Sequence, residues 1–292
     1  MTNPQGPRVV ALGGGHGLAA SLRAIRTYAS EITAVVSVAD DGGSSGRLRD
    51  ELGIPAPGDL RKCLVALGDA DSIWTQALEH RFDAGQLSGH PLGNLMIAGL
   101  TGATGDFTVA LHEVGRLIGA VGRVLPATIT PVVLKAEVSG REIEGQVKVA
   151  QSDHIATVSL VPADALTPME VPEALAAADQ IVIGPGSLFT SVLAAAIVPD
   201  VKAALAATSA QRVYVCNLLP QVPETSGFDV AAHVEALNAH GVVVDIVLCD
   251  PRAMALGVPT GRVVERDLAR PNGLAHDPML LAKALAELSD RL

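Results

Sequence analysis

A glycine-rich turn between an apolar strand and a helix is the feature that most limits how this chain can fold. Residues 9–12 are apolar, and four glycines follow within five positions: Gly13, Gly14, Gly15 and Gly17. Apolar residues then recur every three to four positions, which predicts a helix over residues 18–28. Glycine lets backbone N–H groups approach an anion closely, and a helix N-terminus adds partial positive charge. The segment predicts either a phosphate-binding loop or a tight strand-to-helix turn without a chemical role.

The order of the predicted elements is typical of an α/β protein. Residues 32–39 are a continuous β-branched run, as expected for a parallel strand that is buried on both faces. Together with the first strand and helix, this run makes a βαβ unit of Rossmann type. Alternation resumes later, with strands predicted at residues 180–183, 211–218 and 242–248 and helices at residues 188–197, 230–239 and 277–288. We predict one Rossmann-like domain over residues 1–292, a doubly wound, mainly parallel sheet with helices on both faces.

The middle of the chain breaks this alternation. Short strands are predicted at residues 123–128, 131–136, 146–151 and 157–161, with a turn over residues 138–144. Because no long helix separates them, these strands are expected to pair as antiparallel hairpins. We therefore predict a small β-rich insertion at about residues 122–162.

Composition limits the partners of the chain. Its 292 residues carry a formal net charge of −10 and only 2% aromatic residues, so neither phosphate-backbone binding nor base stacking is expected, and nucleic acid is not a predicted partner. The longest uncharged apolar stretch, residues 180–199, contains glycines and a proline near its start, which argues against a membrane span. The first residues lack a signal peptide, so we expect a cytoplasmic protein. The high apolar content is compatible with a homodimer.

Polar residues follow the second predicted strand. Asp40 and Asp41 end it, at the position where an acid accepts hydrogen bonds from ribose hydroxyls in dinucleotide-binding folds. Two adjacent carboxylates also suit Mg²⁺, which prefers oxygen ligands, and Asp-Gly-Gly is equally a common turn after a strand. The residues that follow predict either an anion-binding nest or the capped start of a helix: Gly42, Gly43, Ser44 and Ser45.

Two further junctions place polar groups at predicted helix starts. Asp59 and Lys62 open the helix predicted at residues 60–67, where Asp59 either caps the helix or faces a ligand. His90 and Asn94 stand at a loop-to-helix junction and are suited either to donate to a phosphate or sugar or to cap the helix.

A second glycine loop lies between a buried strand and a helix. Its candidate phosphate-binding residues are Gly184, Gly186 and Ser187, and the flanking pattern is not that of a GxSxG nucleophile. Asn217 ends the next strand and is a candidate for a hydrogen bond to the ligand. Because carboxyl ends of parallel strands meet at one edge of a sheet, both glycine loops are expected to face one crevice.

Seven motifs occur in order along the chain: ALGGGHGL, VSVADDGGSSGRLR, PGDLRK, HPLGN, GRVLPAT, GPGSLFTSV and YVCNLLPQ followed by ET. Together they resemble the YvcK-like gluconeogenesis factors, part of a CofD-like superfamily that includes 2-phospho-L-lactate transferase. The resemblance covers about residues 8–288. It implies a cytosolic protein that binds UDP-sugars, UDP-N-acetylglucosamine in particular, and is required for normal cell shape and wall synthesis on gluconeogenic carbon sources, without an established reaction.

The same resemblance supplies an alternative function, a Mg²⁺-dependent transfer of phospholactate to a deazaflavin. The transferases line their site with an Asp-Asp pair and a Pro-Asp-Leu-Asp segment. Asp40 and Asp41 match the pair and would hold Mg²⁺ under this alternative, whereas Arg61 replaces the last acid of the segment. That replacement favours the regulatory function. The resemblance also implies an arginine before His276, where this chain has Ala275.

Overall fold

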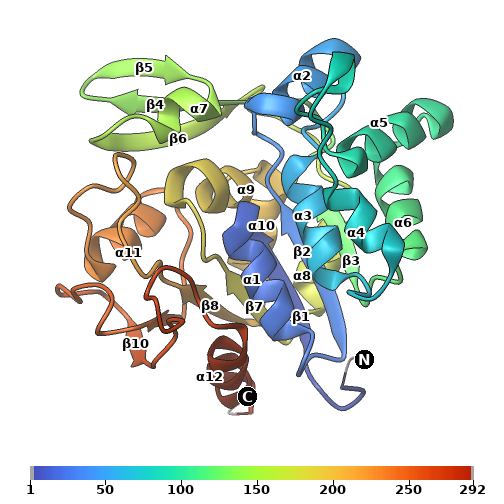
Figure 1. Ribbon diagram of the computed structural model, residues 1–292. Coiled ribbons are helices and arrows are strands. Elements are labelled where there is room, and N and C mark those ends of the chain that lie inside the picture. Colours follow the sequence, from blue (N-terminus) through green and yellow to red (C-terminus); the bar gives the residue numbers. More distant parts are fainter. Residues whose placement is uncertain (1–2, 291–292) are drawn as a thin grey trace.

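The computed structural model describes residues 3–290, in which seven parallel strands form one sheet (Figure 1). The spatial order is β10-β9-β8-β7-β1-β2-β3, and every neighbouring pair is parallel. Their bounds are β1 (Arg8–Gly13), β2 (Glu31–Val36), β3 (Arg123–Pro126), β7 (Gln180–Ile183), β8 (Gln211–Val215), β9 (Ile246–Cys249) and β10 (Arg262–Glu265). The central strands are almost entirely buried, which explains their continuous apolar sequences.

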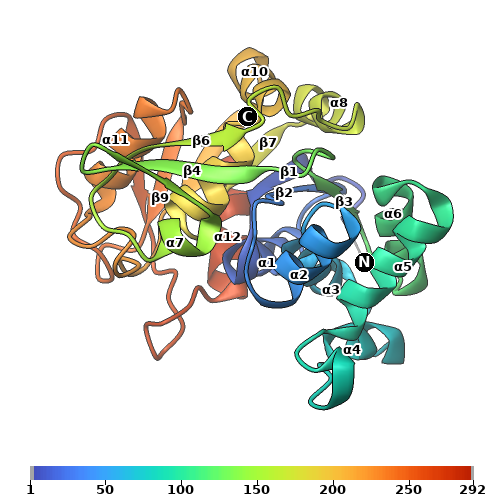
Figure 2. The same cartoon turned by 90° about the horizontal axis from the view of Figure 1, so that it is seen from above.

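Helices cover both faces of this sheet. Figures 1 and 2 show α1 (Gly15–Ile25), α3 (Gly58–Leu67) and α12 (Pro278–Ser289) on one face and α8 (Glu170–Ala177) and α10 (Pro199–Ala207) on the other. The remaining helices are α2 (Gly43–Leu52), α4 (Ile73–Glu79), η1 (Gly85–Leu87), α5 (Leu92–Thr104), α6 (Phe107–Leu117), the π-helical η2 (Leu188–Leu193), α9 (Ala194–Ala196) and α11 (Val230–Ala239). The predicted doubly wound α/β class is confirmed.

The strand order reverses between β1 and β7. From β1 the chain moves outward through β2 to β3, and it later returns to add β7 on the other side of β1. Such a reversal opens a crevice at the carboxyl ends of the two central strands. Both predicted glycine loops lie there, because one follows β1 and the other follows β7.

A separate antiparallel sheet lies above the carboxyl ends of the main strands in Figure 1, in the order β5-β4-β6. It comprises β4 (Val133–Val138), β5 (Arg141–Glu144) and β6 (Ile155–Val161), with α7 (Gln146–Ala150) between the last two. The predicted antiparallel pairing is confirmed, although β3 pairs with β2 in the main sheet, so the small sheet begins at Val133 and not near residue 122.

The predictions for the insertion need two local corrections. Residues 146–151 were predicted as a strand but form α7, because Gly145 turns the chain with a φ of 104° and Asp41 accepts a hydrogen bond from the Val147 N–H at the helix start. The predicted turn over residues 138–144 contains β5.

Among the elements of the main domain, β10, α10 and the short η1 were not predicted. β10 is a half-exposed edge strand with a charge at each end, so it lacks the apolar run of a buried strand. α10 begins with a proline after a short break from α9. Within residues 3–290 no single helix has the length and apolarity of a membrane span; one pair bent by 75°, Leu188–Ala196 with Pro199–Ala207, meets those two criteria jointly.

Candidate functional site

A cavity of about 270 Å³ lies at the strand reversal, between the loops that follow β1 and β7. Segments distant in sequence meet around it, including the start of α1, the end of β2, the start of α3, α7 and the start of η2. The lining residues are Gly14, Gly15, His16, Gly17, Ser37, Asp40, Asp59, Lys62, Gln146, Gly186, Ser187, Thr190, Ser191 and Gln221. Eight of the predicted site residues therefore surround one space: Gly14, Gly15, Gly17, Asp40, Asp59, Lys62, Gly186 and Ser187.

The start of α1 presents backbone donors to this cavity. Leu18 is the first residue whose N–H bonds back into the turn, to the Gly14 carbonyl at 3.3 Å. The N–H groups of Gly15, His16 and Gly17 have no acceptor within residues 3–290, and no side chain caps the helix. These unpaired donors and the helix dipole make the end of α1 suitable for an anion.

Glycine is required in this turn for steric reasons. A Cβ on Gly14 would lie 2.7 Å from Asp59 Oδ2, and a Cβ on Gly17 would overlap the carbonyl group of Pro185. Gly13 has a φ of 149°, and its carbonyl accepts from the Ser37 N–H at 2.8 Å. The two glycine loops therefore pack directly against each other, as their predicted convergence requires.

The loop after β7 is braced from inside the protein. Gly186 N–H donates to Asn217 Oδ1 at 3.0 Å, and Asn217 Nδ2 donates to the Gly186 carbonyl at 2.9 Å. Glu224 Oε1 accepts from the N–H groups of Phe189 at 2.8 Å and Thr190 at 3.1 Å. These bonds use the N–H groups of Gly186, Phe189 and Thr190, whereas those of Ser187 and Leu188 have no acceptor within residues 3–290. Asn217 braces the loop and is not among the residues that line the cavity.

Charged side chains give the cavity a mixed character. Lys62 Nζ lies 3.0 Å from Asp59 Oδ1, and both side chains remain partly exposed to the cavity. Burial raises the pKa of Asp40, and the nearby charge of Asp59 raises it further, whereas the N–H of Gly42 opposes the shift. Burial lowers the pKa of His16, as does the charge of Lys62. Among the residues that line this cavity, Lys62 is the one lysine or arginine, and it shares the cavity with the free amides of α1.

The adjacent aspartates serve different parts of the structure. Asp40 lines the cavity and accepts from Gly42 N–H at 3.0 Å. Asp41 turns away and accepts from the Val147 N–H of α7 at 2.9 Å. Gly43 begins α2 with a φ of 48°. Gly42 and Gly43 therefore form the turn into α2 and are not part of the cavity lining.

Besides Asp41 and Asn217, four further predicted polar residues do not line the cavity: Ser44, Ser45, His90 and Asn94. Three of them form a buried network in which Ser44 Oγ lies 2.8 Å from His90 Nδ1 and accepts from Asn94 Nδ2 at 3.0 Å. Arg61 Nε donates to Asn94 Oδ1 at 3.1 Å. Burial lowers the pKa values of both His90 and Arg61. This network joins α2, α3 and α5, which supports the cavity wall from behind.

The carboxylates do not fit the Mg²⁺ site implied by the transferases. Asp41 is engaged with α7, Asp59 is paired with Lys62, and Arg61 is buried against Asn94. In the described part of the chain, no three His, Cys, Asp or Glu side chains are grouped to hold a metal ion. Since Mg²⁺ is usually held by carboxylates together with phosphates and water, one cavity carboxylate free of a cation is a poor donor set.

Several lining residues were missed by the sequence reasoning. His16 stands inside the glycine run, and this position could have identified it as a lining residue. Thr190 and Ser191 follow the second loop within the motif GPGSLFTSV. Gln146 and Gln221 carried no signal, because neutral polar residues in a predicted strand or loop are commonly exposed.

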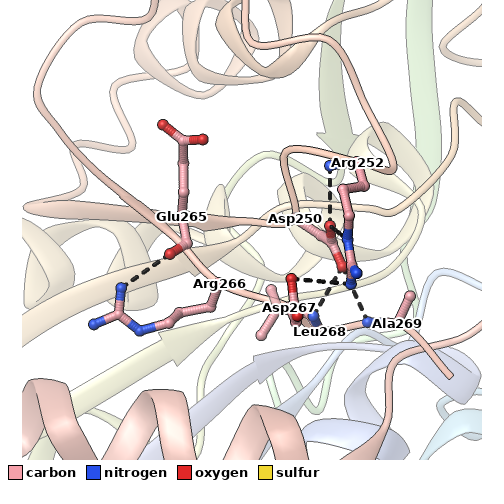
Figure 3. Close-up of polar contacts among 7 residues, drawn as sticks. All are labelled: Asp250, Arg252, Glu265, Arg266, Asp267, Leu268 and Ala269. Carbon is pink, nitrogen blue, oxygen red and sulfur yellow. Dashed lines mark hydrogen bonds and ion pairs between the residues drawn. The ribbon is translucent and has the colours of Figure 1, made fainter.

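A second cavity, of about 820 Å³, lies further along the carboxyl edge. The loop after β8 borders both cavities, through Gln221 on one side and Leu219 on the other. Asp250, which follows β9, is buried and accepts from the N–H groups of Leu268 at 2.9 Å and Ala269 at 3.2 Å (Figure 3). Burial alone would raise the pKa of Asp250, but these N–H groups and Arg252 outweigh it and lower the pKa. The resemblance implies an arginine before His276, and Arg266 and Arg270 are the two candidates for that role; Arg270 lines this cavity.

Comparison with known proteins places the chain in a family. It matches the family described as 2-phospho-L-lactate transferase CofD over residues 9–265. A protein of Mycobacterium tuberculosis (strain ATCC 25618 / H37Rv) is 44% identical, with 95% of this chain and 89% of that protein covered. The gluconeogenesis factor of Bacillus subtilis (strain 168) is 43% identical, with 81% and 75% covered. The crystal structure of a UPF0052 family member from Bacillus halodurans has a TM-score of 0.91 at 37% identity, with 96% and 99% covered. The chain therefore belongs to the CofD family, among the YvcK-like gluconeogenesis factors.

Proposed function

We propose that this chain is a cytoplasmic regulatory protein that binds a nucleotide sugar of the UDP-N-acetylglucosamine type at the carboxyl end of β1. The observation that carries the proposal is the set of unpaired N–H groups at Gly15, His16 and Gly17, in the same cavity as Lys62. Backbone donors at a helix N-terminus together with one ammonium group suit a diphosphate. Its relatives carry the name gluconeogenesis factor. The resemblance of the seven motifs implies a role in cell shape and wall synthesis during gluconeogenic growth.

Cavity size supports a ligand that extends beyond the phosphates. A volume of about 270 Å³ is slightly below the range of about 300–1,000 Å³ typical of ligand cavities, so a nucleotide sugar would have to extend beyond this cavity. The larger cavity beyond Leu219 offers apolar side chains beside Arg270 and Asn272, a suitable environment for a nucleoside. We propose that the phosphates lie at α1 and that the nucleoside lies toward this second cavity.

The transferase alternative has weaker support. It needs a metal ion to neutralise the donor's phosphates. Asp41 is engaged by Val147 and Asp59 by Lys62, which leaves Asp40 as the single cavity carboxylate free to hold this ion. The cavity does contain His16, whose pKa is lowered by burial and which is the nearest candidate for proton transfer. We therefore propose ligand binding, in preference to a transferase reaction, as the function of this site.

The proposal is tested by thermal unfolding of the purified protein with UDP-N-acetylglucosamine, UDP, GDP and ADP, each with and without Mg²⁺. A ligand that binds the folded state raises the transition temperature, and the rise grows with the ratio of ligand concentration to dissociation constant. UDP-N-acetylglucosamine is expected to give the largest rise, and Mg²⁺ is not expected to be required. No rise with either UDP ligand at millimolar concentration, or a rise with guanosine ligands alone, would overturn the proposal.

A further inference from the structure

The small sheet and α7 together form a roof over the ligand cavity. α7 packs against η2, and β6 packs against α9, so this segment lies on the start of the second glycine loop's helix. Figure 1 shows it above the carboxyl ends of the main strands. Gln146, the first residue of α7, is its contribution to the cavity lining. The roof therefore brings a side chain to a cavity built mainly by the main domain.

Two side chains of the main domain hold this roof by its backbone. Asp41 Oδ1 accepts from Val147 N–H at 2.9 Å, directly beside Gln146. At the other end, His240 Nε2 accepts from Val158 N–H at 2.9 Å, and His240 Nδ1 lies 2.7 Å from the Ala236 carbonyl. Since a backbone N–H can only donate, Nε2 is the acceptor and the proton is on Nδ1. The position of Gln146 thus depends directly on Asp41.

The chemistry of Gln146 differs from that of the phosphate end. A carboxamide offers one acceptor and two donors without charge, which suits hydroxyl and amide groups better than a phosphate. Within residues 3–290 the Gln146 side chain has no hydrogen-bond partner, and Gln221, a second carboxamide, lines the same cavity. The cavity therefore has neutral donors and acceptors in addition to the amides of α1.

We infer that Gln146 is a specificity-determining residue that binds the neutral, hydroxyl-rich part of the ligand, and that Asp41 is a positioning residue that places it. This inference rests on the proposed function. It assigns the second aspartate of the Asp-Asp pair to the roof as a hydrogen-bond acceptor, in place of a metal or ribose ligand.

The test compares dissociation constants for UDP-N-acetylglucosamine and for UDP, measured by titration calorimetry. Gln146→Ala is expected to reduce the preference for the nucleotide sugar over UDP by about tenfold, and Gln151→Ala, an exposed glutamine after the same helix, is the matched control. A wild type that binds neither ligand rejects the proposed function. A wild type that binds both, with a preference that Gln146→Ala leaves intact, overturns this inference alone.

Two substitutions of Asp41 distinguish the role of its charge from that of its hydrogen-bond acceptor. Asp41→Asn retains the Oδ1 acceptor. This variant is therefore expected to keep the wild-type preference for the nucleotide sugar over UDP, and hydrogen exchange at the Val147 amide should remain as slow as in the wild type. Asp41→Ala is expected to accelerate that exchange at least about tenfold, with or without ligand, and to weaken the preference as Gln146→Ala does. If Asp41→Asn loses as much as Asp41→Ala, the carboxylate acts through its charge and the positioning role is wrong.

Discussion

Asn217 and Gly186 are joined by a reciprocal pair of hydrogen bonds, in which the side-chain amide both accepts from the glycine N–H and donates to its carbonyl. The amide of Gly186, in the loop after β7, is thereby not available to a ligand. The unpaired N–H groups at the start of α1 remain available to an anion. This division between a braced loop and an open helix end organises the site.

Removal of this brace is expected to destabilise the protein. Asn217→Ala eliminates both bonds and leaves two backbone groups of Gly186 without partners, at a cost of about 1–3 kcal/mol in the free energy of unfolding. Chemical denaturation measures the change. Asn238→Ala, which removes a single long bond to Thr260 in an exposed position, serves as the control and should cost under about 0.5 kcal/mol. Equal losses in the two variants would refute the bracing role.

Because the two glycine loops are in contact, alanine substitution is expected to have opposite effects on stability at different glycines. Gly17→Ala forces a Cβ into the carbonyl of Pro185, where both partners are backbone, and should lower stability by about 2 kcal/mol or more. Gly99→Ala, in an exposed position of α5 with open space around it, should raise stability by about 0.5–1 kcal/mol. Thermal unfolding of both variants decides the point, and a Gly17→Ala protein as stable as the wild type would show that the loops are not in contact.

Arg61→Asp is expected to destabilise the protein without creating a Mg²⁺ site. The new carboxylate would be buried beside Asn94 Oδ1, which now accepts from Arg61, and no cation would compensate it. A buried charge left without a partner costs about 3 kcal/mol. The measurement is the transition temperature with and without MgCl₂, and Arg116→Asp on an exposed helix face is the control. A Mg²⁺-dependent gain in stability for Arg61→Asp would revive the transferase alternative.

The buried His276 is expected to make the free energy of unfolding decrease at acidic pH. Burial lowers the pKa of His276 to about 4, compared with about 6.5 in an unfolded chain. Because the unfolded chain binds the proton more readily, this stability is complete above pH 6.5 and is lost as the pH falls toward 4, by about 3 kcal/mol in total. His276→Gln should therefore flatten the pH dependence of the unfolding free energy between pH 7 and pH 4. His154→Gln, which changes an exposed histidine, should follow the wild-type curve; parallel curves for all three proteins would contradict the assignment.

The fold was predictable for elements whose burial requires a regular pattern of apolar residues. β1, β2 and β7 are covered on both faces, so they appear as uninterrupted apolar runs, and α11 was predicted with its observed bounds. β10 lies at the sheet edge and α7 is held by a tertiary hydrogen bond from Asp41, so local sequence contains little information about either.

The sequence predicted the position of the site but not the role of every side chain in it. Glycines and polar residues after β1, β2 and β7 marked the crevice, because parallel strands align their carboxyl ends. Whether a polar group faces the cavity or a neighbouring backbone depends on packing between distant segments. Asp40 and Asp41 show this, since one lines the cavity and the next residue holds α7. Asn217, Ser44 and Asn94 are likewise polar groups used inside the protein.

The central claim, that an anionic nucleotide sugar binds between α1 and Lys62, is tested most directly by one calorimetric comparison. The dissociation constant for UDP-N-acetylglucosamine is measured for the wild type, for Lys62→Gln and for Lys283→Gln, whose lysine lies on an exposed face of α12. Loss of a charge-assisted contact to the diphosphate should weaken binding by Lys62→Gln at least about tenfold, whereas Lys283→Gln should match the wild type. Equal constants for all three proteins, or no binding by the wild type, would contradict the account.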